Sequence, residues 1–453
     1  MELKGKNVLV LGLGISGIST VKALNKLGAN IIASDLRAEE ELRENISQIK
    51  DLKLELFLGT NDVPLDNIDL LVKSPGIPLE IDIIKRANER GIPVFTDLEL
   101  AYRINPAANF IVITGTNGKT TTTTLVGEFF KKAGYKTHVV GNIGVGLLWN
   151  VVNAGEEDIF VVEASSFQLE STLKFKPRVS LILNITPDHL NWHHTFESYV
   201  NAKKKIFLNQ GAGEYTILNY DDNLLRQMEG DVNSNLVWFS VDNSLSKGIC
   251  IEDGCVVIRD EDRTYQVMET KDIKILGKHN LENALASISI GWIMGLDIEI
   301  MKDVLSEFPG VEHRIEYVDT IEGVSFYNDS KGTNPEASIK AIEAVNPPII
   351  LIAGGQDKGS DFKDFILSFK GKVKALVLLG ETREKIKNTA IKLGFNNIYI
   401  VNNMKEAVYK SYEIADKGDN VLLSPACSSW DMYPSFEVRG EDFKEAVYSL
   451  KEE

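Results

Sequence analysis

The 453-residue sequence is short of cysteine, of net positive charge and of long apolar runs. Its three cysteines, Cys250, Cys255 and Cys427, lack the spacing of metal ligands, which argues against a disulfide framework and indicates a reducing compartment. The formal net charge of −16 argues against a nucleic-acid binder held by a basic surface. No apolar stretch approaches the roughly 18 residues that span a bilayer, and the first residues lack a signal-peptide pattern. We therefore expect a cytoplasmic protein with no membrane or nucleic-acid partner.

The composition is that of a globular protein, with 43% hydrophobic and 25% charged residues. At about 150 residues per domain, the length suggests about three domains. Apolar strand-like runs alternate with helix-compatible stretches, which predicts α/β domains with parallel sheets, and a small antiparallel excursion is expected around residues 256–267. The alternation restarts near residues 105 and 308. We expect a Rossmann-like domain at 1–105, a P-loop ATPase-like mononucleotide-binding domain at 106–308, and a second Rossmann-like domain at 309–453.

The most informative segment is Thr114-Gly115-Thr116-Asn117-Gly118-Lys119-Thr120-Thr121, between an apolar run and a helix-compatible stretch. Strand, glycine-rich turn, Lys-Thr and helix is the arrangement of a phosphate-binding loop. Its N–H groups would face the phosphates of ATP, Lys119 would neutralise the terminal ones, and the Thr120 hydroxyl would ligate Mg²⁺. The usual pattern has a glycine where this chain has Ile113, so the loop is a variant. A chance Gly-Lys-Thr in a turn is the alternative.

A second glycine-rich turn, Gly12-Leu13-Gly14-Ile15-Ser16-Gly17, follows the first expected strand, and Asp35 ends the next strand. This pattern is typical of a dinucleotide site, in which the acid binds ribose hydroxyls. It favours a diphosphate-bearing nucleotide, although the glycines could merely pack a helix on a strand. Two anion-binding loops in two domains predict an enzyme that uses a nucleoside triphosphate and a substrate linked to a nucleoside diphosphate.

Two polar side chains follow apolar runs in the expected central sheet. Glu163 ends one strand, where a magnesium ligand is expected, and a solvated glutamate is the alternative. His189 follows another strand and could bind metal or substrate, although a lone histidine is more often structural.

Lysines and asparagines on two expected helices are less distinctive. Of the consecutive lysines, Lys204 and Lys205 are expected on a solvated helix face, and position alone does not set Lys203 apart. Asn280 and Asn283 would share a helix face and could bind adenine or ribose, but helix capping is the alternative for Asn280.

Three polar turns follow apolar runs in the last third of the chain, at residues 328–335, 354–359 and 424–429. Because the carboxyl ends of parallel strands meet at one edge of a sheet, these turns could converge on a single crevice. Their density of polar side chains suits an anion or substrate.

Together these segments resemble the Mur ligase family over essentially the whole chain. The loop at residues 115–121 has the form shared by Mur ligases and folylpolyglutamate synthetase, which accounts for Ile113. Residues 328–331 and 424–429 resemble the member that adds D-glutamate. The resemblance implies an ATP-dependent ligase that adds D-glutamate to UDP-N-acetylmuramoyl-L-alanine in peptidoglycan precursor synthesis, through an acyl phosphate. A monomer is expected.

The resemblance also implies roles for individual residues. ATP would be bound by Gly115, Thr116, Asn117, Gly118, Lys119, Thr120, Thr121, Asn280, Asn283, Arg314 and Asp329. The UDP-linked substrate would be bound by Ile15, Ser16, Asp35, Leu36, Arg37, Gly76, Asn142 and His189. D-glutamate would be bound by Lys331, Thr333, Lys358, Ser429 and Phe436. Two Mg²⁺ ions would be held by Thr120, Glu163, His189 and Lys203. Lys203 would carry a carbamate, since a hard cation requires an oxygen ligand. Lys119, Glu163, His189 and Lys203 are the expected catalytic residues.

Two departures and three alternatives accompany this interpretation. Trp430 replaces a smaller apolar residue of the family, which predicts a narrower D-glutamate pocket, and Gln356-Asp357 varies while Lys358 is kept. A sibling ligase that adds another amino acid is the nearest alternative. An NAD-dependent oxidoreductase based on residues 12–17 leaves the phosphate-binding loop unexplained. A non-catalytic nucleotide switch would hydrolyse ATP without any dependence on an amino acid.

Overall fold

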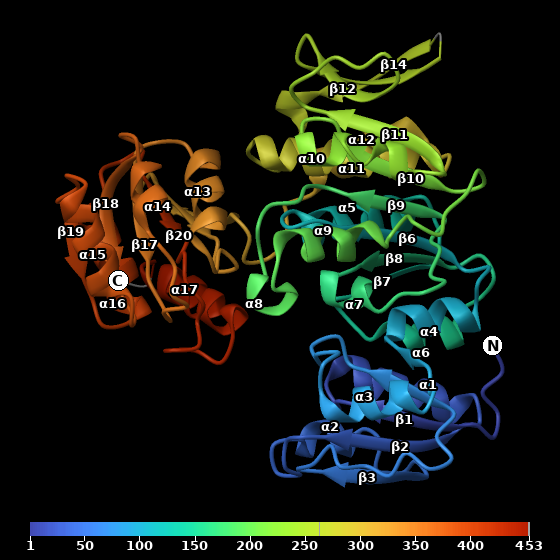
Figure 1. Cartoon of the computed structure of the whole chain (residues 1–453). Coiled ribbons are helices and arrows are strands. Elements are labelled where there is room, and N and C mark those ends of the chain that lie inside the picture. Colours follow the sequence, from blue (N-terminus) through green and yellow to red (C-terminus); the bar gives the residue numbers. More distant parts are fainter. Residues whose placement is uncertain (262, 452–453) are drawn as a thin grey trace. The chain divides into compact units, whose positions relative to one another are not determined.

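The computed structural model of the protein describes residues 1–261 and 263–451. These residues form two compact units, each treated by itself below. The first unit comprises residues 1–270 and 282–304, and the second comprises residues 271–281 and those from Leu305 onward. Figure 1 colours the chain from blue at its N-terminus to red at its C-terminus.

The first unit opens with a parallel sheet of order β3-β2-β1-β4-β5. Its central strand β1 is almost fully buried, as expected for a strand covered on both faces. The strands are β1 (Asn7–Leu11), β2 (Asn30–Asp35), β3 (Leu54–Leu58), β4 (Leu70–Lys73) and β5 (Val94–Phe95). The helices of this segment are α1 (Ile15–Lys26), α2 (Arg43–Ser47) and α3 (Asp82–Glu89).

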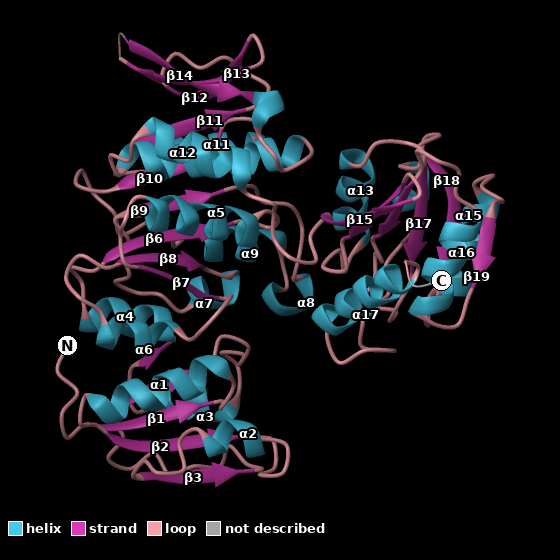
Figure 2. Ribbon diagram, turned by 180° about the vertical axis from the view of Figure 1, so that it is seen from behind, coloured by secondary structure: helices cyan, strands magenta, loops and turns pink. Residues whose placement is uncertain are grey.

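A larger sheet of order β14-β13-β12-β11-β10-β9-β6-β8-β7 follows in the same unit. It is parallel from β7 to β12, and β12, β13 and β14 pair antiparallel at one end (Figure 2). The strands are β6 (Asn109–Thr114), β7 (Thr137–Gly141), β8 (Ile159–Glu163), β9 (Val179–Ile182), β10 (Tyr215–Asn219), β11 (Asn235–Ser240), β12 (Gly248–Glu252), β13 (Cys255–Asp260) and β14 (Arg263–Glu269).

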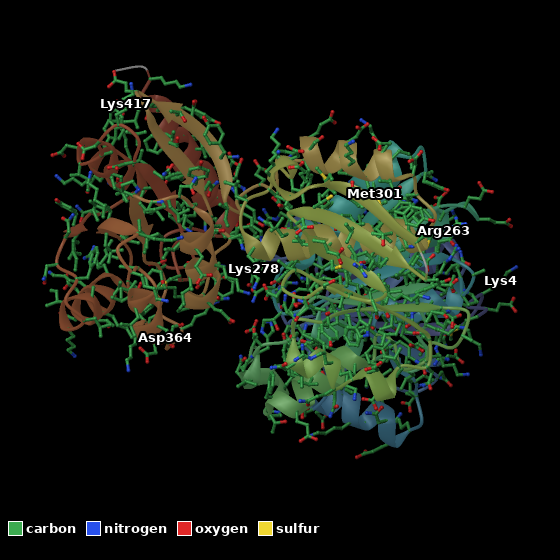
Figure 3. The ribbon with its side chains drawn as sticks, turned by 90° about the horizontal axis from the view of Figure 1, so that it is seen from above. Lys4, Arg263, Lys278, Met301, Asp364 and Lys417 are labelled. Carbon is green, nitrogen blue, oxygen red and sulfur yellow. The ribbon has the colours of Figure 1, made fainter. Side chains whose placement is uncertain are left out.

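Helix α5 packs on β6, β7 and β8 of this sheet. Helices α11 and α12 also pack closely, since a Cβ on Gly291 would lie 2.3 Å from the sulfur of Met301, a residue labelled in Figure 3. The helices of this segment are α4 (Asp97–Ile104), α5 (Lys119–Lys132), α6 (Leu147–Asn153), α7 (Ser166–Glu170), α8 (Leu190–His193), α9 (Phe196–Lys204), α10 (Asn223–Arg226), α11 (Lys278–Ile293) and α12 (Ile298–Glu307), with short 3₁₀ turns at Glu229–Asp231 and Thr270–Asp272.

The second unit is built on a sheet of order β15-β16-β20-β17-β18-β19, parallel except for the edge strand β15. Buried side chains form an apolar cluster on each side of this sheet. The strands are β15 (Glu316–Ile321), β16 (Val324–Asn328), β17 (Ile349–Ala353), β18 (Val373–Leu378), β19 (Ile398–Ile400) and β20 (Asn420–Leu423). The helices are α13 (Pro335–Ala344), α14 (Lys363–Leu367), α15 (Arg383–Lys392), α16 (Met404–Glu413) and α17 (Phe436–Ser449).

The predicted fold class is confirmed, with three mainly parallel sheets in the described residues and an antiparallel excursion at β12–β14. Sequence analysis did not single out β3, β10, β11, β12 or β15. Strand β3 is an edge strand with only partly buried or exposed residues, so it carries no continuous apolar run. The boundaries at residues 105 and 308 remain predictions. No helix in the described part of the chain is long and apolar enough to cross a membrane.

Candidate active site

The phosphate-binding loop joins β6 to α5. Gly118 is the N-cap of α5 and has φ 85°, in the left-handed region that favours glycine. A Cβ at this position would also lie 2.3 Å from Asn283 Oδ1, so a side chain there would displace Asn283 as well as strain the backbone. The loop therefore presents the N-terminus of a 14-residue helix, where backbone N–H groups suit a phosphate.

Lys119, the first residue of α5, folds back over this loop. Its ammonium donates hydrogen bonds to the carbonyl oxygens of Gly115 and Thr116, each at 2.8 Å. The two threonines after Lys119 differ in burial. Thr120 is half-buried, whereas Thr121 is buried and its hydroxyl has no hydrogen-bond partner among the described residues.

The segment after β9 braces the same loop. The backbone N–H of Asn117 donates to Asn184 Oδ1 at 2.9 Å, and Asn184 Nδ2 donates back to the Asn117 carbonyl at 3.2 Å. The Thr116 hydroxyl donates to the Thr186 carbonyl at 3.1 Å. Sequence analysis took only His189 from this segment; Asn184 was missed, although its position directly after an apolar strand was an available signal.

Glu163 ends β8, beside the strand that leads into the loop. It is 2% exposed, and its Oε1 accepts a hydrogen bond from Asn142 Nδ2 at 2.9 Å. Its Oε2 is buried without a hydrogen-bond partner in the described residues. A buried carboxylate oxygen left in this state is a fitting ligand for a divalent cation, since burying an unpaired charge is costly. Asn142, expected at the substrate, thus also orients Glu163.

Lys203 lies near the end of α9 and is 1% exposed. Its Nζ donates to the Gly115 carbonyl at 2.8 Å and to the Thr114 hydroxyl at 3.3 Å, and it lies 4.8 Å from the centre of the Tyr199 ring. Burial, reinforced by the positive charge of Lys119, holds the pKa of Lys203 well below its ordinary range. A buried lysine in this state is available as a neutral, nucleophilic amine.

Lys204 and Lys205 behave differently from Lys203. Lys204 Nζ forms an ion pair with Asp231 at 2.5 Å, and Lys205 donates to the Glu170 carbonyl. Both lysines were expected on a solvated helix face. Lys204 is partly exposed and pairs with the surface acid Asp231, whereas Lys205 is partly buried and ties the end of α9 to the end of α7.

His189 precedes α8 in a left-handed conformation, with φ 53°. Its ring centre lies 4.8 Å from that of Phe167. Burial, opposed by Asp188 and reinforced by Lys119 and Lys203, lowers the pKa of His189, which favours the neutral ring that binds metals. The nearby His193, which sequence analysis missed, is buried with Nε2 3.0 Å from the Ser166 hydroxyl.

Six of the eight residues expected at the UDP-linked substrate lie at or after the carboxyl ends of β1, β2 and β4, whereas Asn142 and His189 follow β7 and β9 of the larger sheet. The Ser74 hydroxyl donates to the Gly12 carbonyl at 3.1 Å, so the turns at residues 12–17 and 74–76 touch. Asp35 accepts from the Leu13 N–H at 2.7 Å and pairs with Arg37 at 2.8 Å. The remaining expected residues are Ile15 and Leu36, both exposed, together with Ser16 in the first turn and Gly76 in the second.

In the second unit the three polar turns do converge, because β16, β20 and β17 are neighbours. The Ser424 hydroxyl donates to Asp329 Oδ2 at 2.7 Å, and the Gly354 N–H donates to the Pro425 carbonyl at 2.9 Å. Arg439 of α17, which sequence analysis missed, donates to the Ser330 carbonyl at 2.8 Å and to the Cys427 carbonyl at 3.1 Å.

Asp329 is the buried acid of this cluster. Burial raises its pKa to about 7, opposed by the Ser424 hydrogen bond and by the charge of Arg314. Arg314 has a buried Nε without a hydrogen-bond partner in the described residues. An acid and a cation held in this way are able to bind the polar groups of a nucleotide.

The expected D-glutamate residues lie on the same three turns and on α17. Lys331 Nζ lies 5.4 Å from the centre of the Phe436 ring, and Lys358 Nζ lies 4.8 Å from that of Trp430, which is 64% exposed. Both are cation–π distances. Thr333 closes the first turn through its N–H to the Lys331 carbonyl, and the other member, Ser429, is buried.

The two asparagines of α11 have separate contacts. Asn280 Nδ2 donates to the Leu276 carbonyl at 2.7 Å, so it ties the start of the helix to the chain before it. The Thr122 hydroxyl donates to Asn283 Oδ1 at 3.2 Å, which places Asn283 against α5. Asn283 also lies against Gly118 of the phosphate-binding loop, since a Cβ on that glycine would meet its Oδ1.

Three family models match the chain in series. They describe the MurD-like N-terminal domain of Mur ligases over residues 6–96, the Mur ligase middle domain over 113–291, and the Mur ligase glutamate ligase domain over 313–427. The chain belongs to the Mur ligase family. Mur ligases are ATP-dependent enzymes, so the phosphate-binding loop has a function within the family.

Relatives of this Mur ligase match over its whole length. It is 50% identical to the UDP-N-acetylmuramoylalanine--D-glutamate ligase of Alkaliphilus oremlandii and 48% identical to that of Clostridioides difficile, with full coverage of both chains in each case. Among solved structures, the UDP-N-acetylmuramate-alanine ligase MurC from Thermotoga maritima matches with TM-score 0.62 and 19% identity, covering 98% of this Mur ligase and 99% of that chain. The MurF ligase from Thermotoga maritima in complex with ADP matches with TM-score 0.59 and 18% identity, covering 99% and 96%. These structures show the Mur ligase fold.

Proposed function

We propose that the protein joins D-glutamate to UDP-N-acetylmuramoyl-L-alanine at the expense of ATP. The observation that carries this proposal is that relatives named for that reaction match the whole chain with 48–50% sequence identity. The phosphate-binding loop with Lys119, together with the buried Glu163 and Lys203, would supply the groups that ATP chemistry requires. The proposal includes a monomeric enzyme that works in the cytoplasm, where ATP is made.

Magnesium would be held by Thr120, Glu163, His189 and a modified Lys203. The residues fit because Glu163 Oε2 is buried without a partner in the described residues, and because burial lowers the pKa of His189, which favours its neutral ring. As a neutral amine, Lys203 would add to carbon dioxide, forming an N–C bond and losing a proton, to leave an anionic carbamate. Bound Mg²⁺ would offset the repulsion between the substrate carboxylate and the γ-phosphate.

The proposed reaction runs through an acyl phosphate. A carboxylate is a poor acyl donor, so its oxygen attacks the γ-phosphorus of ATP and ADP leaves. The amine of D-glutamate then attacks the acyl carbon, and phosphate leaves from the tetrahedral intermediate. Lys119 and the loop N–H groups would hold the transferring phosphoryl group, while Lys331 and Lys358 would bind the two carboxylates of D-glutamate.

The test is phosphate release from Mg-ATP and UDP-N-acetylmuramoyl-L-alanine, with D-glutamate, L-glutamate or no amino acid. We expect release only with D-glutamate. Release only with another amino acid would replace the proposed substrate with that of a sibling ligase. Release without any amino acid would indicate a nucleotide switch, and no release under any condition would contradict the proposal.

A further inference from the structure

Lys73 is a buried cation that none of the roles above uses. It ends β4, is 1% exposed and is one of the bulkiest fully buried side chains of the chain. Its Nζ donates to the Ile77 carbonyl at 2.8 Å and to the Pro75 carbonyl at 3.3 Å. The ammonium therefore holds the backbone of the turn at residues 74–77 from the inside.

This turn is in contact with the first glycine-rich turn. The Ser74 hydroxyl bonds to the Gly12 carbonyl, and a Cβ on Gly12 would lie 2.7 Å from the Ser74 oxygen. A shift of one turn would therefore displace the other. Lys73 lies beneath the pair of turns at which the nucleotide diphosphate of the proposed substrate would bind.

Acidic groups from three other segments attract the charge of Lys73. They are Asp97 at the start of α4, Glu170 at the end of α7 and Glu80 beyond the turn. The centre of the Trp192 ring lies 6.0 Å from Nζ, and Trp192 Nε1 donates to Glu170 Oε2 at 3.1 Å. Lys73 thus links the turn to α8, the helix that follows His189.

We propose that Lys73 is a positioning residue for the diphosphate of the UDP-linked substrate, holding the turn at residues 74–77 in shape and placing a buried positive charge beneath it. The inference rests on the proposed function, because it assumes a UDP-linked substrate. The hydrogen bonds to the Pro75 and Ile77 carbonyls place the ammonium of Lys73 directly against the backbone of this turn, where its positive charge would attract an anion bound at the turn.

A second consequence concerns protons. Burial lowers the pKa of Lys73 to about 8 despite the attraction of Glu170, Asp97 and Glu80. A bound diphosphate adds negative charge nearby and raises this pKa again, so binding near pH 8 takes up a fraction of a proton.

The test is calorimetric titration of UDP and of uridine into the full chain, for wild type, Lys73→Met and the control Lys85→Met, whose lysine is exposed on α3 of the same segment. Methionine keeps much of the volume and removes the charge. We expect Lys73→Met to lower the affinity for UDP about tenfold and the affinity for uridine less than twofold, since only UDP carries the diphosphate. The control should change neither.

An equal loss of affinity for UDP and uridine, or an unchanged affinity for UDP, would overturn the role of Lys73 while leaving the proposed function intact. Failure of the wild type to bind either ligand would instead contradict the UDP-linked substrate itself. If Lys73→Met does not fold, the test is calorimetric titration of UDP into the wild type at pH 8 in buffers of different ionisation enthalpy. We expect net proton uptake on binding. Binding without proton uptake would overturn the proposal.

Discussion

Lys119 and Lys203 donate hydrogen bonds to the same oxygen, the carbonyl of Gly115, each at 2.8 Å. Two ammonium groups this close repel each other, and Lys203 is the more deeply buried of the two. The pKa of Lys203 is therefore held far below its ordinary range, first by burial and then by Lys119. The lowered pKa favours the neutral amine that the proposed carbamate at Lys203 requires, while Lys119 remains the proposed phosphate ligand.

Replacement of Lys119 by alanine should lower kcat by about 100-fold or more, because a charged donor to the transferring phosphoryl group is lost. The melting temperature should change little. Lys131→Ala is the matched control: it removes an exposed ion pair with Glu128 in the last turn of the same helix, a pair that contributes about 0–1 kcal/mol. Steady-state phosphate release measures both variants, and wild-type activity in Lys119→Ala would disprove the loop assignment.

Lys203→Ala should lose activity by about 100-fold or more, and acetate or another short carboxylate should restore part of it by supplying the missing oxygen ligand. Lys204→Ala, which removes only the pair with Asp231, should retain wild-type activity. In wild type, a carbamate signal should appear by ¹³C NMR in labelled bicarbonate and vanish in Lys203→Ala. A fully active Lys203→Ala without additive would exclude the carbamate.

Asn142→Ala should raise the Mg²⁺ concentration needed for half-maximal activity by about 10- to 100-fold, because Asn142 fixes one oxygen of Glu163 while the other stays available. The KM for D-glutamate should remain near the wild-type value. Asn153→Ala on the exposed face of α6 serves as the control. A change in substrate KM with no change in Mg²⁺ dependence would show that Asn142 acts on substrate alone.

Asp329 predicts a pH dependence of stability in the ligand-free protein. Its pKa rises on folding from 3.8 to about 7. The folded state therefore binds this proton more tightly, so its contribution is fully present below pH 3.8 and is lost as pH rises through 7. The total is on the order of 4 kcal/mol. In urea unfolding, the free energy of unfolding of Asp329→Asn should fall less between pH 5 and pH 8 than that of the wild type. An identical fall in both proteins would contradict the raised pKa of Asp329.

Lys358→Met should raise the KM for D-glutamate about tenfold by removing a charged donor, while the KM for ATP stays unchanged. Lys363→Met, at an exposed position of α14, is the control. Initial rates at varied D-glutamate give the comparison. An equal rise in both KM values would mean that the variant disturbs the second unit rather than the amino-acid site.

Much of the fold was predictable because its signals are local. The expected strand before the first glycine-rich turn is β1, and the expected helix after the phosphate-binding loop is α5, since a buried apolar run and a glycine turn are defined within a few residues. Strand β3 lacks such a run, and its register follows from pairing with β2, which sequence analysis could not supply.

For the site, the sequence by itself determined the two glycine-rich turns and the positions of polar residues after apolar strands. The tertiary structure decided which of them meet. Lys203 reaches the Gly115 carbonyl across 88 residues of chain, and Ser424 reaches Asp329 across 95. Such contacts depend on the order of strands in a sheet and on burial, which sets the charge state of Lys203 and Asp329. Neither property is contained in local sequence patterns, because both arise from residues far apart in the chain.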